Sequence, residues 1–155
     1  MRVLLDIGED GGEDRLQWML EANGQEVVRA SSKGEELVAF IGEAEHFHAA
    51  VVSQASLGKK WPRLLRQLRK QAPRLPVVLL LGPRADRTWR LAILAGAFDA
   101  VPASPEAAMP ALSRALGYVV GKAVGELFVE GTPLGGAEPS VAATLPQHAA
   151  LASQR

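Results

Sequence analysis

The segment at residues 49–57, AAVVSQASL, decides the fold. Its first four residues are small or β-branched and apolar, and such a run predicts a strand at residues 49–52 that is buried on both faces. The strand delivers Ser53 and Gln54 to the loop at its carboxyl end. Ligands of open α/β sheets bind at that end of the strands. Ser53 is therefore the first candidate functional residue.

The sequence on either side of this strand repeats one pattern, in which a short apolar run is followed by an amphipathic segment. Strand and helix alternate five times, which is typical of a parallel sheet with helices on both faces. One predicted helix, between the second and third strands, is identified by its apolar face, Leu37, Val38, Phe40 and Ile41. The other predicted elements are strands at residues 2–5, 26–30, 75–82 and 98–101, and helices at residues 14–22, 61–71, 84–95 and 105–124.

Residues 125–155 differ from the rest of the chain because they are rich in Gly, Ala, Pro and Ser. This composition predicts a flexible linker or tail. Within it, residues 127–129 are predicted as a short strand and residues 146–153 as a short helix. The expected organisation is thus one folded domain at residues 1–124, followed by the linker or tail.

The composition is that of a globular protein whose chemistry involves no thiol. Of the 155 residues, 48% are hydrophobic and 22% are charged, as expected for a globular domain. The absence of cysteine excludes disulfides, thiolate catalysis and zinc–thiolate sites. No apolar run approaches the ~20 residues of a membrane span, and MRVLLDIGED reads as a first strand, not as a signal peptide. We therefore expect a cytoplasmic protein without a membrane partner.

Charge is unevenly distributed along the chain although the net charge is zero. Residues 1–57 contain 4 basic and 11 acidic side chains, whereas residues 58–155 contain 13 and 6. In the basic half, Lys59, Arg63 and Arg66 recur at helical spacing with Lys70. Such a stripe can bind phosphate backbones. No aromatic residue is interleaved with it, however, so a solvated face is favoured and nucleic acid is not an expected partner.

The sequence contains neither a complete metal site nor the motif of a serine hydrolase. His46 and His48 precede the central strand, but no third metal ligand is evident beside them. Ser53 lacks the G-x-S-x-G elbow of serine hydrolases, and no histidine follows at a suitable strand end. We expect neither an enzyme nor a bound cofactor.

Four segments together resemble the receiver domain of two-component response regulators. They are RVLL at residues 2–5, NGQEVVRASSKGEEL at 23–37, LLRQLRKQAPRLPVVLLLG at 64–82 and AILAGAFDAVPASP at 92–105. The last is similar to the AGAxDYLxKP segment of that family. The resemblance covers residues 1–124 and implies a flavodoxin-like, doubly wound five-stranded parallel sheet with the strand order 2-1-3-4-5.

The resemblance also implies a phosphorylation pocket, and this sequence lacks its residues. Receivers use a phosphoacceptor aspartate on the central strand, two metal-binding acids, a Ser or Thr, a Lys and an aromatic residue. Aspartyl phosphorylation needs a carboxylate nucleophile and a metal ion that neutralises the phosphoryl charge. We therefore predict a degenerate receiver, or pseudo-receiver. The five elements fall, in that order, on Ser53, on Ile7 and Gly8, on Gly82, on Ala103 and on Ala100.

One alternative concerns the acids near the first strand. Asp6, Glu9 and Asp10 lie within one to three positions of the expected pair, so a shift in the loop would let a divalent ion bind without phosphorylation. Solvated carboxylates at a helix amino terminus are the favoured interpretation.

The predicted function is an atypical receiver-like signalling module that acts through protein–protein contacts. The resemblance implies a partner face made by the fourth helix, fifth strand and fifth helix, with Arg87, Arg90 and Arg114 as candidate polar contacts. The partner would be another signalling protein or a second copy of the chain. The alternative is a small-molecule or metal sensor that uses the crevice at the carboxyl ends of the strands.

Overall fold

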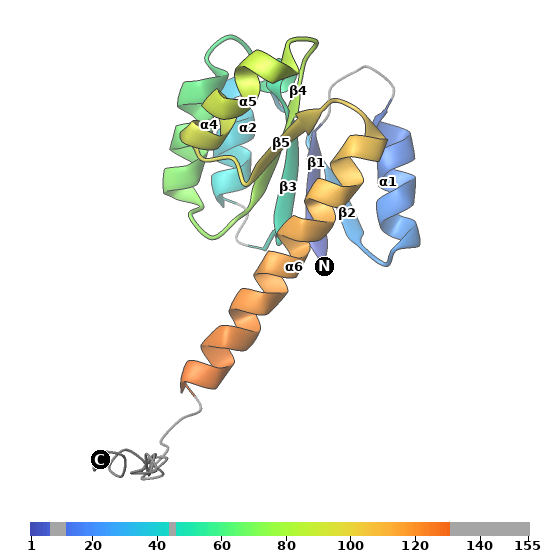
Figure 1. The fold of residues 1–155 in the computed structure, drawn as a ribbon, viewed down its shortest axis with the longest axis vertical. Helices are drawn as coiled ribbons and strands as arrows, with labels where there is room; N and C mark the ends of the chain where they lie inside the picture. Colours follow the sequence, from blue (N-terminus) through green and yellow to red (C-terminus); the bar gives the residue numbers. More distant parts are fainter. Residues whose placement is uncertain (7–11, 44–45, 131–155) are drawn as a thin grey trace, which may run out of the picture.

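In a computed structural model of the chain, which describes residues 1–6, 12–43 and 46–130, five parallel strands form one sheet (Figure 1). Their order is β2-β1-β3-β4-β5, as in the flavodoxin-like fold. The predicted fold class is therefore confirmed. The strands are β1 (Arg2–Asp6), β2 (Glu26–Arg29), β3 (Ala49–Ser53), β4 (Val77–Leu81) and β5 (Asp99–Pro102).

Helices cover both faces of this sheet (Figure 1). One layer contains α2, α4 and α5, and the other contains α1 and α6, while the short α3 lies at the carboxyl end of β3. The observed α4 has the bounds predicted for it, whereas the short α3 was not predicted. The helices are α1 (Glu13–Ala22), α2 (Gly34–Glu43), α3 (Gln54–Leu57), α4 (Trp61–Gln71), α5 (Ala85–Ala95) and α6 (Pro105–Glu130).

The central strand β3 supplies the core on both sides of the sheet. Its five residues are all buried. Ala50 and Val52 pack in the cluster beneath α2, α4 and α5, whereas Ala49 and Val51 pack in the cluster beneath α1 and α6. This alternation follows from the two-residue period of a strand. The position of β3 between β1 and β4 thus explains the uninterrupted apolar run.

The carboxyl-terminal helix differs from its prediction. It continues past residue 124 to Glu130, so residues 127–129 are helical and the predicted strand there is wrong. A continuing helix satisfies each backbone group internally, whereas an added strand would need a sheet edge as its partner. The first half of α6 packs on the sheet, and the second half extends away from it (Figure 1). The predicted helix at residues 146–153 lies outside the described residues.

Candidate functional site

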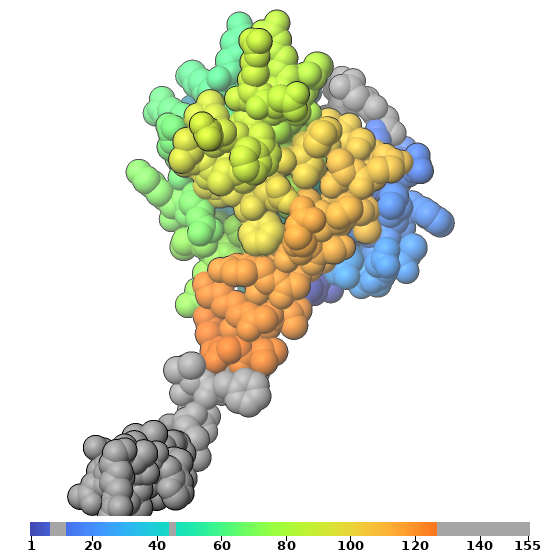
Figure 2. All heavy atoms as spheres, viewed as in Figure 1, coloured from blue at the N-terminus to red at the C-terminus, as the bar shows by residue number. Residues whose placement is uncertain are grey.

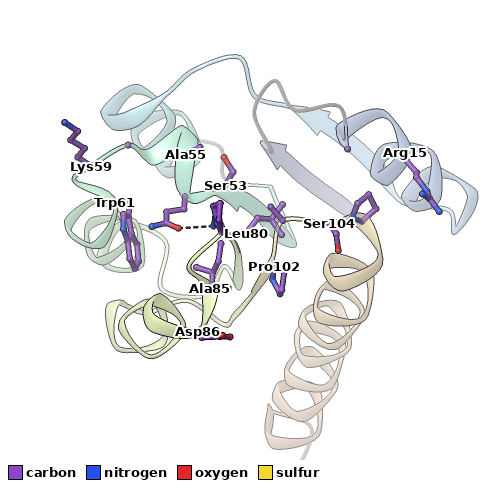
Figure 3. A pocket seen from close by; sticks show the side chains of 18 residues that line it. Arg15, Ser53, Ala55, Lys59, Trp61, Leu80, Ala85, Asp86, Pro102 and Ser104 are labelled. Carbon is purple, nitrogen blue, oxygen red and sulfur yellow. Dashed lines mark hydrogen bonds between the residues drawn. The ribbon is translucent and has the colours of Figure 1, made fainter.

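A cleft of about 1370 Å³ opens at the carboxyl ends of β3, β4 and β5 (Figure 3). This is the edge of the sheet at which the sequence places the site. Apolar side chains such as Trp61 and Leu81 line much of the cleft, together with the backbone of Gly82. Two cations, Arg15 and Lys59, lie at opposite ends of it in Figure 3. Arg15 forms an ion pair with Glu106 at 3.0 Å.

Ser53 ends β3 and is buried, with 4% of its surface exposed. Its hydroxyl caps α3 by accepting a hydrogen bond from the Ser56 N–H at 3.0 Å. The same hydroxyl donates to Ser56 Oγ at 2.9 Å. A serine at this position is a preferred helix cap because it satisfies a backbone N–H that the helix leaves free. The Ser53 hydroxyl therefore has a structural role in the described structure.

The hydrogen-bond chain continues from Ser56 to a buried acid. Ser56 Oγ donates to Asp6 Oδ1 at 3.0 Å, which joins the ends of β1 and β3. Asp6 is 4% exposed, and its Oδ2 has no hydrogen-bond partner in the described part of the chain. We call Ser53, Ser56 and Asp6 the buried polar network. It stands where the resemblance implies a phosphoacceptor carboxylate.

Burial raises the pKa of Asp6 from 3.8 to about 6, because removing a carboxylate from water disfavours its charged form. The Ser56 hydrogen bond acts in the opposite direction, since it stabilises the carboxylate. The charge of Glu13 raises the pKa further, and that of Lys33 lowers it. The sequence-based interpretation of Asp6 as a solvated carboxylate is therefore wrong. Asp6 ends β1 beside Val52 of β3, and its side chain is buried.

The structure also describes the other predicted pocket positions, Gly82, Ala103 and Ala100. Gln54 Oε1 accepts a hydrogen bond from the Gly82 N–H at 3.1 Å, drawn as a dashed line in Figure 3. This backbone donor is thus already used. Ala103 is exposed at the cleft but carries no charge, and Ala100 is buried in the core.

The remaining metal candidates are not brought together in the described residues. Ile7, Gly8, Glu9 and Asp10 lie outside the parts that the structure describes. His48 Nδ1 accepts a hydrogen bond from the Arg2 N–H at 3.0 Å, which ties the start of β1 to the loop before β3. In residues 1–6, 12–43 and 46–130, no three or more His, Asp or Glu side chains are grouped to hold a metal ion. Nor does any helix there combine the length and hydrophobicity needed to cross a membrane.

Solved structures with this architecture include response regulator receiver domains. A receiver domain protein from Clostridium thermocellum is 24% identical, with a TM-score of 0.61, over 76% of this chain and 94% of that one. The corresponding values for one from Methanospirillum hungatei are 23%, 0.61, 78% and 96%. The chain has a receiver-like fold.

This receiver-like fold does not by itself identify an activity. A protein described as an adenylate cyclase from Rhodopirellula baltica is 20% identical, with a TM-score of 0.68, over 84% of this chain and 98% of that one. At such identities the likeness shows the fold alone. No family model and no curated protein matches the sequence. Function must therefore be argued from the residues of the receiver-like domain.

Sequence reasoning identified Ser53 but missed its two partners. Ser56 follows Ser53 by three residues, which is the spacing of a capping hydroxyl and the N–H that it accepts. That local signal would have predicted α3. Asp6 lies 50 residues away from Ser56 in sequence, and only the pairing of β1 with β3 brings it near.

We expect the Asp6→Asn substitution to remove a loss of stability, on the order of 3 kcal/mol, that the wild type shows as the pH rises from 3.8 to about 6. The folded pKa of Asp6, about 6, lies above its ordinary 3.8, so the native state binds more protons between these two values. The free energy of unfolding contributed by Asp6 therefore falls as the pH rises through that range. Urea denaturation at a series of pH values should show this loss in the wild type and not in the variant.

The matched control is Asp86→Asn, which neutralises an exposed carboxylate on α5. Its pH dependence should follow that of the wild type. If Asp6→Asn also follows the wild type, Asp6 does not titrate as described.

Proposed function

We propose that this receiver-like domain is an atypical signalling module that acts through protein–protein contacts and without aspartyl phosphorylation. The buried polar network is the observation that carries the proposal. Where a phosphoacceptor would present a free carboxylate, Ser53 presents a hydroxyl that both accepts and donates a hydrogen bond inside the protein. Attack on a phosphoryl donor would require this hydroxyl to break those bonds and to find a base.

The surroundings of Ser53 support the same conclusion. A transferred phosphoryl group needs nearby cations and hydrogen-bond donors for its developing charge. Ala103 supplies no cation, and the Gly82 N–H is held by Gln54. These two positions therefore supply neither the cation nor the free hydrogen-bond donor that a phosphoryl group on Ser53 would use.

Helix α5 provides the first part of an interaction surface, because its large side chains point away from the core. Ala92 and Ala95 are the buried residues of this helix. Leu94 is 74% exposed and Trp89 is 49% exposed. An ordinary surface helix shows the opposite arrangement, with its large apolar residues turned inward. Exposed apolar side chains in one region mark a binding surface.

The apolar surface continues across the edge of the sheet to α6. Strand β5 is the edge strand of the described sheet and contacts both α5 and α6, and the two helices lie on the face shown in Figure 2. Phe98, just before β5, packs against Tyr118 with ring centroids 5.6 Å apart. Tyr118 is 50% exposed, and Val120 and Val124 beyond it are 47% and 45% exposed. We call this region the α5–β5–α6 face.

The arginines predicted for this face differ in their availability. Arg87 and Arg90 are exposed on α5. Arg114 on α6 forms an ion pair with Asp99 at the start of β5. Arg114 thus helps to hold α6 against the strand, while Arg87 and Arg90 remain the candidate polar contacts of the rim.

A second copy of the chain is the partner that we propose for this face. Most soluble homo-oligomers are twofold dimers, in which the same patch of each subunit meets its counterpart. An apolar patch that borders a free strand edge suits such self-pairing, because both subunits gain the same burial. A different signalling protein would bind the same residues.

The cleft favours one other function, the binding of a small molecule. Its 1370 Å³ exceeds the volume of many ligand pockets, and apolar walls with cations at its ends would suit an anionic ligand. A thermal-shift screen against nucleotides and divalent metals tests this alternative. Stabilisation by one compound, abolished by Lys59→Gln, would support it over a purely protein-binding role.

Incubation with acetyl phosphate and Mg²⁺ should leave the mass of the intact protein unchanged. The Ser53→Asp variant should also remain unmodified or react very slowly, because Gly82 and Ala103 still supply no stabilising side chain. A stable adduct that saturates in the wild type would contradict the proposal. Any adduct should be mapped, so that modification at Ser53 is distinguished from modification elsewhere.

Leu94→Arg should convert a dimer into a monomer in sedimentation equilibrium. The substitution places a charge at the most exposed large apolar residue of the α5–β5–α6 face, and burying an unpaired charge is strongly unfavourable. Trp18→Arg is the matched control, since Trp18 is 69% exposed on α1. A wild type that stays monomeric at every concentration, or equal effects of the two substitutions, would exclude a second copy as the partner.

A further inference from the structure

The outward surface of α4 carries cations that no acid in the described part of the chain neutralises. Residues 46–85, all of which the structure describes, contain eight Lys and Arg and no Asp or Glu. Arg63, Arg66 and Lys70 are exposed and share one face of α4, and the exposed Lys59 lies in the turn just before the helix. We call these four residues the α4 stripe.

None of the four side chains has an ion-pair partner in the described part of the chain. The acids of the opposite layer are differently placed. Asp14 pairs with Arg29, and Glu106 pairs with Arg15. The α4 stripe is therefore a concentration of free positive charge, and mutual repulsion of its members opposes folding by a few tenths of a kcal/mol for each close pair.

We propose that the α4 stripe binds the phosphodiester backbone of a nucleic acid, independently of base sequence. From Arg63 to Lys70 the helix rises by about 10 Å, and duplex DNA presents about six phosphate charges over that length of its axis. Contacts of this kind need cations alone. They do not require the interleaved aromatic residues whose absence, in the sequence, favours a solvated face.

The helices beside α4 favour a nucleic acid over an anionic membrane as the ligand of the α4 stripe. Helix α4 packs between α2 and α5. On α2 the carboxylates Glu35, Glu36 and Glu43 are exposed, and these would be repelled by an anionic membrane lying across the helical layer. Residues 46–85 also expose no large apolar side chain that could enter a bilayer or anchor a protein partner. A single row of cations beside an acidic helix matches a single row of phosphates better than it matches a continuous anionic surface.

The test measures fluorescence anisotropy of a labelled duplex of arbitrary sequence, about 20 base pairs long, titrated with the full chain. At about 50 mM salt we expect a dissociation constant of about 1–100 µM, and a slope of log K against log salt of about −3 to −4. Replacing Arg63, Arg66 and Lys70 together by Gln should weaken binding at least tenfold and reduce the slope by about one for each cation removed.

The matched control for Arg66→Gln is Lys122→Gln, which removes one exposed cation from α6. It should bind the duplex like the wild type. Arg66→Gln alone should lower the slope by about one, and this variant serves if the triple substitution impairs folding, as judged by circular dichroism.

Three results would overturn the proposal. The first is that the wild type does not bind the duplex. The second is that the stripe and control variants lose affinity equally, which would indicate a net-charge effect only. The third is binding to phosphatidylserine-containing vesicles without binding to the duplex, which would assign the stripe to a membrane surface instead.

Discussion

The burial of β3 on both faces is the constraint on which the rest of the molecule depends. Every residue of this strand is covered, and alternate side chains serve the two cores. A strand without a free face can present functional groups only at its ends. The carboxyl end of β3 is Ser53, and its hydroxyl is already committed to α3 and Ser56. The centre of the sheet therefore provides stability, and binding must use the cleft rim or the outer helices.

The buried polar network has an energetic cost, because it places the Asp6 carboxylate away from water. A carboxylate placed among apolar strands is strongly disfavoured unless its oxygens are hydrogen-bonded. Ser56 satisfies only one oxygen of Asp6, and the raised pKa of Asp6 is the measure of the remaining imbalance. The network thus links β1 to β3 through a group that is easily neutralised. The folded state is therefore less stable when Asp6 is charged. The Ser53 hydroxyl donates its hydrogen bond to Ser56, so the network does not activate Ser53 as a nucleophile.

The sequence predicted the sheet well because the information for it is local. Apolar runs and helical spacing predicted the alternating elements and the bounds of α4. The strand order came from the receiver resemblance. The site was predicted less well because its key contact joins Ser56 to Asp6 across 50 residues. The length of α6 was underestimated, because the composition of residues 125–155 predicted a linker or tail, whereas the helix continues to Glu130. The exposed face of α5 was foreseeable: Ala92 and Ala95 lie together on one side of a helical projection, and Leu94 lies opposite.

The two outer surfaces differ in the physics by which they would bind, and this difference makes them separable. The α5–β5–α6 face offers apolar area, and burial of apolar area depends little on moderate salt. The α4 stripe offers charge, and its affinity for phosphates must fall steeply as counterions compete. Helices α4 and α5 are adjacent in one layer, so a dimer paired through α5 would keep both α4 stripes available only if its partner subunits leave α4 uncovered. Pairing would then place two stripes on one particle, and a long duplex that reached both would bind more tightly than one that reached a single stripe.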